Sequence, residues 1–265
     1  MTAGRATTTY VMRLKMADRP GALAEAAARI AAVRGDLVGI EILERTNGEV
    51  IDELIVQLPD VGLLDVMCSE LAEVDQLEIE SIGELDAAGI DPQLTALEIA
   101  DVIVGAATVD DLLWSLCAHT RRVIRSDWAC VLDGAGTVIA SSGSSPHEGW
   151  LVAFVAGRAE EVTDGWSGEA EWMPLPVACG PLTLVLGRAE SPLRAKERQR
   201  AAALARVAGS WCNRLREQSR QASMLVHPSG AFLPLHPAGT NRGWEATGDS
   251  VAATPPADWF ADRSR

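Results

Sequence analysis

The stretch "ADRPGALAEAAARI", residues 17–30, decides the fold of the first part of the chain. It places an acidic residue, a proline and a glycine directly before an alanine-rich segment. The preceding residues, "TTYVMRLKM" at 8–16, alternate in apolar character and predict a strand. Apolar residues then recur at three- and four-residue spacing and predict a surface helix, which Gly35 ends: Leu23, Ala26, Ala27, Ile30 and Val33.

The next fifty residues predict three more strands and a second helix. Residues 36–44 and 50–58 both alternate around the tight turn "TNG" and predict an antiparallel hairpin, with Val38, Ile40 and Ile42 pointing inward. A helical stripe runs from Val61 to Leu71, and residues 76–85 read as a last strand. The order βαββαβ predicts a ferredoxin-like α+β domain, with two helices on one face of a four-stranded sheet.

Two motifs within this pattern carry a family resemblance. "DRPGAL" (18–23) lies between the first strand and first helix, and "RGDLV" (34–38) leads into the second strand. Residues 8–86 with these motifs resemble the ACT family of small-molecule-sensing domains. The resemblance implies a homodimer, paired side by side or face to face, that binds an amino acid between the start of the first helix and the start of the second strand. The implied ligand-binding positions are Asp18, Pro20, Gly21, Ala22, Leu23, Asp36 and Leu37.

Elementary chemistry makes this site plausible. The first N–H groups of a helix have no partner within the helix and carry the positive end of its dipole, so a ligand carboxylate can dock there. Gly21 leaves room for a close approach, and Asp18 and Asp36 can accept hydrogen bonds from an α-ammonium group. The other interpretation is a helix cap alone, in which Pro20 presets the backbone and an aspartate satisfies nearby N–H groups. Both interpretations stay open.

A linker at 87–93 leads to a second domain at 94–221. Residues 94–106 predict an apolar helix, and Thr108 with Asp111 predicts the capped start of another. Two strand pairs are predicted at 128–143 and 171–189, with a short helix between them at 149–157. Ser191 and Pro192 predict the start of a long terminal helix.

This second pattern, residues 94–218, resembles a GAF domain, chiefly in the run "VLGRAESPLRAKE" and the helix after it. The Asn-Lys…Phe…Asp-Glu signature of cyclic-nucleotide-binding GAF domains is absent, so we expect no cyclic nucleotide. The terminal helix carries a stripe that predicts either a coiled-coil seam or packing on its own domain: Ala201, Leu204, Ala208, Trp211 and Leu215. Six tryptophans could line a ligand cavity, but ordinary packing is favoured.

Charge limits the partners. The net charge of −14 argues against nucleic acid and anionic membranes. Residues 1–86 hold 17 acidic against 7 basic residues, whereas residues 192–221 hold 8 basic against 2 acidic. We favour a solvated face for this basic helix over an anion or partner site. Residues 222–265 have a composition typical of a disordered tail.

The sequence holds no catalytic signature, so we expect no enzyme, no catalytic residue, no metal and no cofactor. It also lacks a signal peptide and a membrane span, and its five scattered cysteines predict reduced core thiols in a cytoplasmic protein. The prediction is a regulatory protein whose ACT domain senses an amino acid at a dimer interface and whose GAF-like domain serves signalling or assembly. The alternative is a ligand-free interaction scaffold or accessory subunit that recruits a protein partner through the GAF-like domain and basic helix.

Overall fold

The computed structural model describes residues 7–85, 92–157, 168–178 and 180–225. The chain from Met1 to Val226 forms one compact unit that holds two four-stranded antiparallel sheets. Most of the predicted linker at 87–93, and the predicted tail at 222–265 from residue 226 onward, lie outside the described residues, whereas residues 222–225 belong to the last helix and not to the tail.

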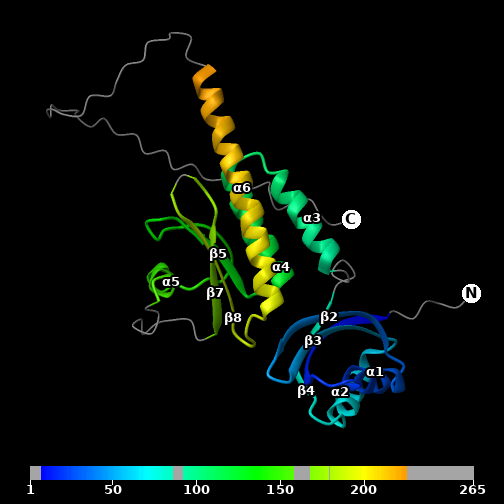
Figure 1. Ribbon diagram of the computed structural model, residues 1–265. Helices are drawn as coiled ribbons and strands as arrows, with labels where there is room; N and C mark the ends of the chain where they lie inside the picture. Colours follow the sequence, from blue (N-terminus) through cyan, green and yellow to red (C-terminus); the bar gives the residue numbers. More distant parts are fainter. Residues whose placement is uncertain (1–6, 86–91, 158–167, 179, 226–265) are drawn as a thin grey trace, which may run out of the picture. The chain divides into compact units, whose positions relative to one another are not determined.

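The N-terminal part has the predicted βαββαβ order. It consists of β1 (Thr8–Ala17), α1 (Ala22–Ala32), β2 (Asp36–Thr46), β3 (Glu49–Leu58), the 3-10 turn η1 (Val61–Leu63), α2 (Leu64–Ala72) and β4 (Glu78–Glu84). The strand order is β2-β3-β1-β4, and α1 and α2 cover one face of the sheet (Figure 1). The core between them is aliphatic and rich in methionine: Met12, Leu14, Met16, Ile30, Leu54, Val56, Leu58, Met67 and Leu71.

Strand β1 is buried on both faces. Met12 and Leu14 point toward the helices, whereas Val11 and Arg13 lie on the opposite face because successive side chains alternate. On that second face Val11 pairs with Ile55 and Arg13 pairs with Glu53 across β3, and all four residues are buried. The helix-free face of this sheet is therefore also an interior surface.

Strand β2 departs from the prediction. Val38, Ile40 and Ile42 are 37%, 47% and 41% exposed instead of inward. The register explains this, because Ile40 lies opposite Leu54 and so faces the helix side, but β2 is the outermost strand. The helices leave that edge uncovered, and an apolar edge strand is left at the surface.

The C-terminal part contains the remaining elements. They are α3 (Pro92–Val104), α4 (Val109–Ile124), β5 (Trp128–Leu132), β6 (Val138–Gly143), α5 (Glu148–Val155), β7 (Glu169–Leu175), β8 (Leu182–Arg188) and α6 (Ala195–Leu225). The strand order is β6-β5-β8-β7. As predicted, Thr108 caps α4, and its hydroxyl accepts a hydrogen bond of 3.1 Å from the Asp111 N–H.

The long helix α6 begins at Ala195, later than predicted, because Ser191 is not its cap. The Ser191 hydroxyl is buried and accepts hydrogen bonds from arginines, while the Glu197 carboxylate accepts the N–H of Arg194 at 2.8 Å. The apolar stripe of α6 packs on its own part of the chain, as the second interpretation held, through the buried residues Ala201, Leu204, Ala205, Ala208, Cys212 and Leu215.

The tryptophans mostly serve packing. Trp128 and Trp150 meet edge to face at 6.3 Å, and Phe154 stacks on Trp150. Trp114 and Trp172 are largely exposed, and Trp166 lies outside the described residues. Among the helices in the described ranges, none is long and apolar enough to cross a bilayer.

Gly35, between α1 and β2, provides a test of this packing. A Cβ there would lie 2.7 Å from the Ile30 Cγ2 and 3.2 Å from the Leu58 Cδ2, whereas one at Gly83 would meet only a Val11 methyl at 3.8 Å. We expect Gly35→Ala to lower the free energy of unfolding by about 1–3 kcal/mol. Gly83→Ala, the matched control, should change it by less than about 0.5 kcal/mol.

Urea unfolding followed by circular dichroism measures both variants. Equal stability of the two would contradict the close approach of α1 to β3 at Gly35.

Candidate functional site

The start of α1 is open. Gly21 precedes the helix with φ of +93°, a left-handed conformation that favours glycine, and no side chain caps the helix. A Cβ built on Gly21 would meet nothing within 4 Å. Asp18 does not act as the cap. Its N–H donates to the Gly48 carbonyl, and its carboxylate lies 3.9 Å from the Arg45 guanidinium.

The predicted ligand-binding residues separate into two groups. Asp18, Pro20, Gly21, Ala22 and Leu23 gather where β1 ends and α1 begins. Asp36 and Leu37 open β2 at the other end of the sheet, because Asp36 and Thr9 pair with the same residue, Gln57. The ten-residue β1 between these ends is about 30 Å long. One chain therefore does not bring the two groups together.

Sequence reasoning missed a buried carboxylate near the start of α1. Asp52 on β3 is only 3% exposed, and its Oδ1 has no hydrogen-bond partner within the described structure. Burial raises the pKa of Asp52, and the nearby Asp18 carboxylate adds to the rise while Arg45 opposes it. Asp52 occupies a position in the alternation of β3 that is otherwise apolar, between Val50 and Leu54. A charged residue at such a position was the one feature of the sequence that could have indicated a buried carboxylate.

The second polar site is a buried ion-pair network around Arg13 on the helix-free face of the N-terminal sheet. The Arg13 Nη2 donates to Glu53 at 3.2 Å and to Glu197 of α6 at 2.9 Å. Arg188 at the end of β8 donates to the same Glu197 oxygen at 2.8 Å. The network thus joins β1 to β8 and α6, and each of these charged side chains is less than a tenth exposed.

Arg125 completes the network from the end of α4. It adopts a left-handed conformation with φ of +54°, and its guanidinium binds Glu53 through two hydrogen bonds of 2.7 and 3.0 Å. Burial alone would raise the pKa of Glu53, but Arg125 and Arg13 together hold it below its usual value. Burial likewise opposes the charge of Arg13, and Glu197 and Glu53 nevertheless raise its pKa.

The basic start of α6 extends this network across β2 and β4. Arg194 pairs with Glu80 and lies 3.4 Å from Glu44, and Arg200 donates to both carboxylate oxygens of Glu41 at 2.6 and 2.8 Å. The expectation of a solvated face for this helix is therefore wrong at these positions. The partners of these basic residues are acidic residues of the N-terminal sheet. Considering the acidic and the basic cluster separately could not predict this pairing.

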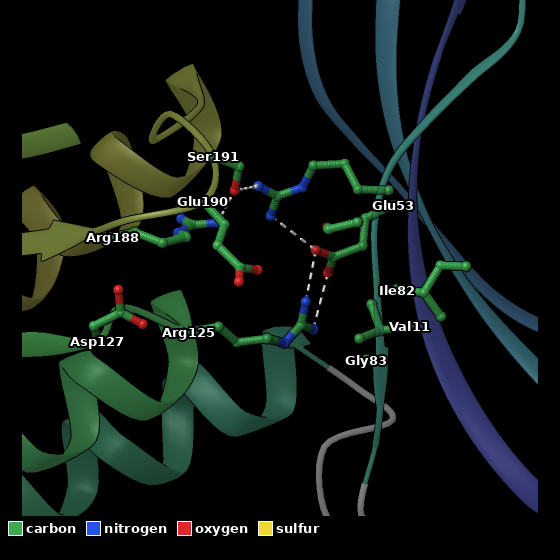
Figure 2. Close-up of a pocket in the computed structure, with 11 residues that line it drawn as sticks. Val11, Glu53, Ile82, Gly83, Arg125, Asp127, Arg188, Glu190 and Ser191 are labelled. Carbon is green, nitrogen blue, oxygen red and sulfur yellow. Dashed lines mark hydrogen bonds and ion pairs between the residues drawn. The ribbon is translucent and has the colours of Figure 1, made fainter. Parts of the chain in front are cut away.

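A cavity of about 170 Å³ lies beside the network (Figure 2). Arg125, Asp127, Arg188, Glu190 and Ser191 line it from the C-terminal part. The N-terminal sheet contributes its remaining lining residues: Val11, Arg13, Glu53, Ser81, Ile82 and Gly83. Figure 2 shows the Arg125 guanidinium bonded to the Glu53 carboxylate at this cavity.

The cysteines in the described ranges are free thiols, and Cys117 lies fully buried on α4. Burial raises the pKa of Cys130 to about 12, which makes it an inert core thiol. Within the described residues no group of three or more His, Cys, Asp or Glu side chains could hold a metal ion.

Comparison with known proteins gives likenesses of fold. No family model and no curated protein matches the chain. The ACT domain of a GTP pyrophosphokinase from Chlorobium tepidum aligns with 30% of this chain and 100% of its own length, at 14% identity and a TM-score of 0.25. The GAF domain of a sensor histidine kinase, described as putative, from Pseudomonas syringae pv. tomato aligns with 51% of this chain and 91% of its own, at 15% identity and a TM-score of 0.33.

A third structure, described as a putative glycine cleavage system transcriptional repressor, aligns with 83% of this chain and 92% of its own at 10% identity and a TM-score of 0.28. The N-terminal part has the βαββαβ order, and the C-terminal part has a four-stranded antiparallel sheet and a long terminal helix; after the likenesses above they are called the ACT-like and the GAF-like part. The site geometry, rather than these distant likenesses, carries the function proposed below.

Glu197 tests the energetic weight of the network. Glu197→Gln removes the carboxylate that Arg13 and Arg188 share, and leaves Arg188 buried without its anion. We expect the free energy of unfolding to fall by about 3–5 kcal/mol. Lys196→Gln on the same helix, whose ion pair with Glu41 is partly exposed, should cost less than about 1 kcal/mol.

Urea unfolding of both variants makes the comparison. A loss for Glu197→Gln no larger than that for Lys196→Gln would show that the buried network adds nothing beyond a surface pair.

Proposed function

We propose that the protein is a non-enzymatic regulatory protein whose ACT-like part senses an amino acid at the interface of a homodimer, and whose GAF-like part responds. The observations that carry this proposal are the uncapped, open start of α1 and the buried, unpartnered oxygen of Asp52, which lies close enough to Asp18 for their charges to interact. A cap alone does not account for them, because no side chain occupies the capping role that the second interpretation assigned to Asp18 or Asp36.

The chemistry at the start of α1 suits both ends of an amino acid. The ligand carboxylate would accept hydrogen bonds from the first N–H groups of α1, where the helix dipole is positive. Its ammonium would be held by the carboxylates of Asp18 and Asp52. An ammonium at Asp52 would also compensate for the cost of a charge that burial disfavours.

A second copy of the chain would complete the site. Asp36 and Leu37 lie far from Gly21 in one chain, so they can contribute only from a partner. The exposed apolar edge of β2 offers the surface for that partner, since Val38, Ile40 and Ile42 stand at an uncovered sheet edge. A ligand that contacts both chains would stabilise one dimer arrangement and shift its population.

The ion-pair network supplies the route to the GAF-like part. Strand β1 carries Arg13 and ends next to the start of α1, so a shift of β1 on ligand binding reaches Glu197 and Arg188 directly. The scaffold alternative is weaker, because Arg194 and Arg200 already pair with acidic residues of the same chain.

Thermal unfolding against the twenty amino acids, each at about 10 mM, tests the sensor. A ligand present at about 100 times its dissociation constant should stabilise the folded protein by ~2.7 kcal/mol. We expect one amino acid or a related group to raise the Tm, and Asp52→Asn to remove the part of the rise that this site contributes. Asp65→Asn, an exposed aspartate on α2, is the matched control and should keep it.

Asp52→Asn should not cost stability at pH 7. A carboxylate whose pKa is raised by folding contributes stability at low pH, which is lost as the pH rises through its folded pKa, so removing the charge lifts that penalty. No response to any amino acid in the wild type, or an unchanged response in Asp52→Asn, would contradict the assigned site.

The dimer has its own test in the pair of exposed isoleucines on β2. Replacing Ile40 and Ile42 with lysine should convert a dimer into a folded monomer, because charged lysines block pairing at a sheet edge. Sedimentation equilibrium measures the mass, and circular dichroism checks the fold. A doubly substituted chain that remains dimeric would place the interface elsewhere.

A further inference from the structure

The floor of the cavity beside the ion-pair network carries two arginines, which are paired with Glu53 and Glu197. Arg13 and Arg188, the two arginines of this floor, come from the N-terminal and C-terminal parts, and their side chains are 3% and 8% exposed. The Nε–H of each has no hydrogen-bond partner within the described structure. A buried donor without a partner is costly, and guanidinium donors strongly prefer carboxylates.

The two floor arginines also crowd one another. Both donate to the same Glu197 oxygen and to the same Ser191 hydroxyl. Burial lowers the pKa of Arg188, and the nearby Arg13 charge lowers it further in spite of Glu197. An additional anion beside the two guanidinium groups would relieve this repulsion.

The rim of the cavity carries the opposite charge. Asp127 and Glu190, the acidic rim, are exposed, and the Asp127 carboxylate accepts the Ala189 N–H at 2.8 Å. Figure 2 shows the Glu190 carboxylate beside Arg188 in the space facing Glu53. Rim carboxylates repel a dianion such as phosphate and attract an ammonium group. A volume of about 170 Å³ takes several waters or one small molecule.

From these observations we infer that the cavity binds a small aminocarboxylate, with its carboxylate on the floor arginines and its ammonium at the acidic rim. The site differs from the one proposed at the start of α1, and a single chain contains all of it. Because its floor comes from both parts of the chain, the bound molecule would tie the N-terminal sheet to β8. A carboxylate on two guanidinium donors gains charge-assisted hydrogen bonds from both.

Thermal unfolding of Asp52→Asn tests this inference, because that background silences the proposed α1 site. The probes are the twenty amino acids, with acetate and methylammonium as the separate halves of glycine, all at one ionic strength. We expect at least one amino acid to raise the Tm in a saturable manner and more than either half does. If the site at the start of α1 does not exist, the wild type and Asp52→Asn should respond alike. The failure of that site can therefore be told apart from the failure of the cavity site.

Two further substitutions in that background locate the binding. Arg188→Lys keeps the charge but removes the planar guanidinium, and Glu190→Gln removes a rim charge at an exposed residue. Each should raise the dissociation constant about tenfold, which corresponds to the loss of one charge-assisted hydrogen bond. Glu217→Gln, an exposed glutamate near the far end of α6, is the control and should leave binding unchanged.

A circular dichroism spectrum shows whether Arg188→Lys folds. If Arg188→Lys does not fold, the affinity of Glu190→Gln alone tests the site. No amino-acid response in Asp52→Asn, a response to acetate as large as that to the amino acid, or affinity unchanged by Glu190→Gln would each overturn the inference.

Discussion

The buried guanidinium of Arg13 is the constraint on which the arrangement of this chain depends. A charge with almost no exposure must be paired, and its two carboxylates come from β3 and from α6. Those carboxylates are held in turn by Arg125 and Arg188, which belong to the GAF-like part. The helix-free face of the ACT-like sheet is thereby an interior surface and not a free one. Part of the acidic charge of the N-terminal sheet, at Glu41, Glu44 and Glu80, pairs with the basic residues at 194–200.

The sequence predicted the local elements well because their signals are local. The alternation of β1, the glycine before α1 and the Thr108 cap each lie within a few residues of the element they specify, and all three are found in the structure. The network was missed because its partners are far apart in the chain, with Arg13 and Glu197 separated by 184 residues. Ser191 was misassigned for the same reason, since two arginines, one of them distant in the sequence, use its hydroxyl.

The candidate ligand site shows a similar division. Gly21 and Asp18 were predicted from a motif, and they lie together where the motif implied. The separation of Asp36 from them follows only from strand register, and Asp52 emerged only when burial was known. A charged residue in the apolar phase of a strand, as with Asp52, is a usable signal for a buried carboxylate. Arg13 shows its limit, because it lies on the helix-free side of β1, the side it shares with Lys15, and is nevertheless buried.

The most direct test of this account is whether the ACT-like part stabilises the GAF-like part through the network. All eight tryptophans lie beyond residue 113, so tryptophan fluorescence reports only on the second half of the chain. Arg13→Gln alters the first half, where there is no tryptophan. We expect this change to lower the urea midpoint reported by tryptophan, and Glu197→Gln to cost less in the Arg13→Gln background than in the wild type, because one of its two buried ion pairs is already lost. An unchanged tryptophan midpoint in Arg13→Gln would contradict the coupling of the two parts.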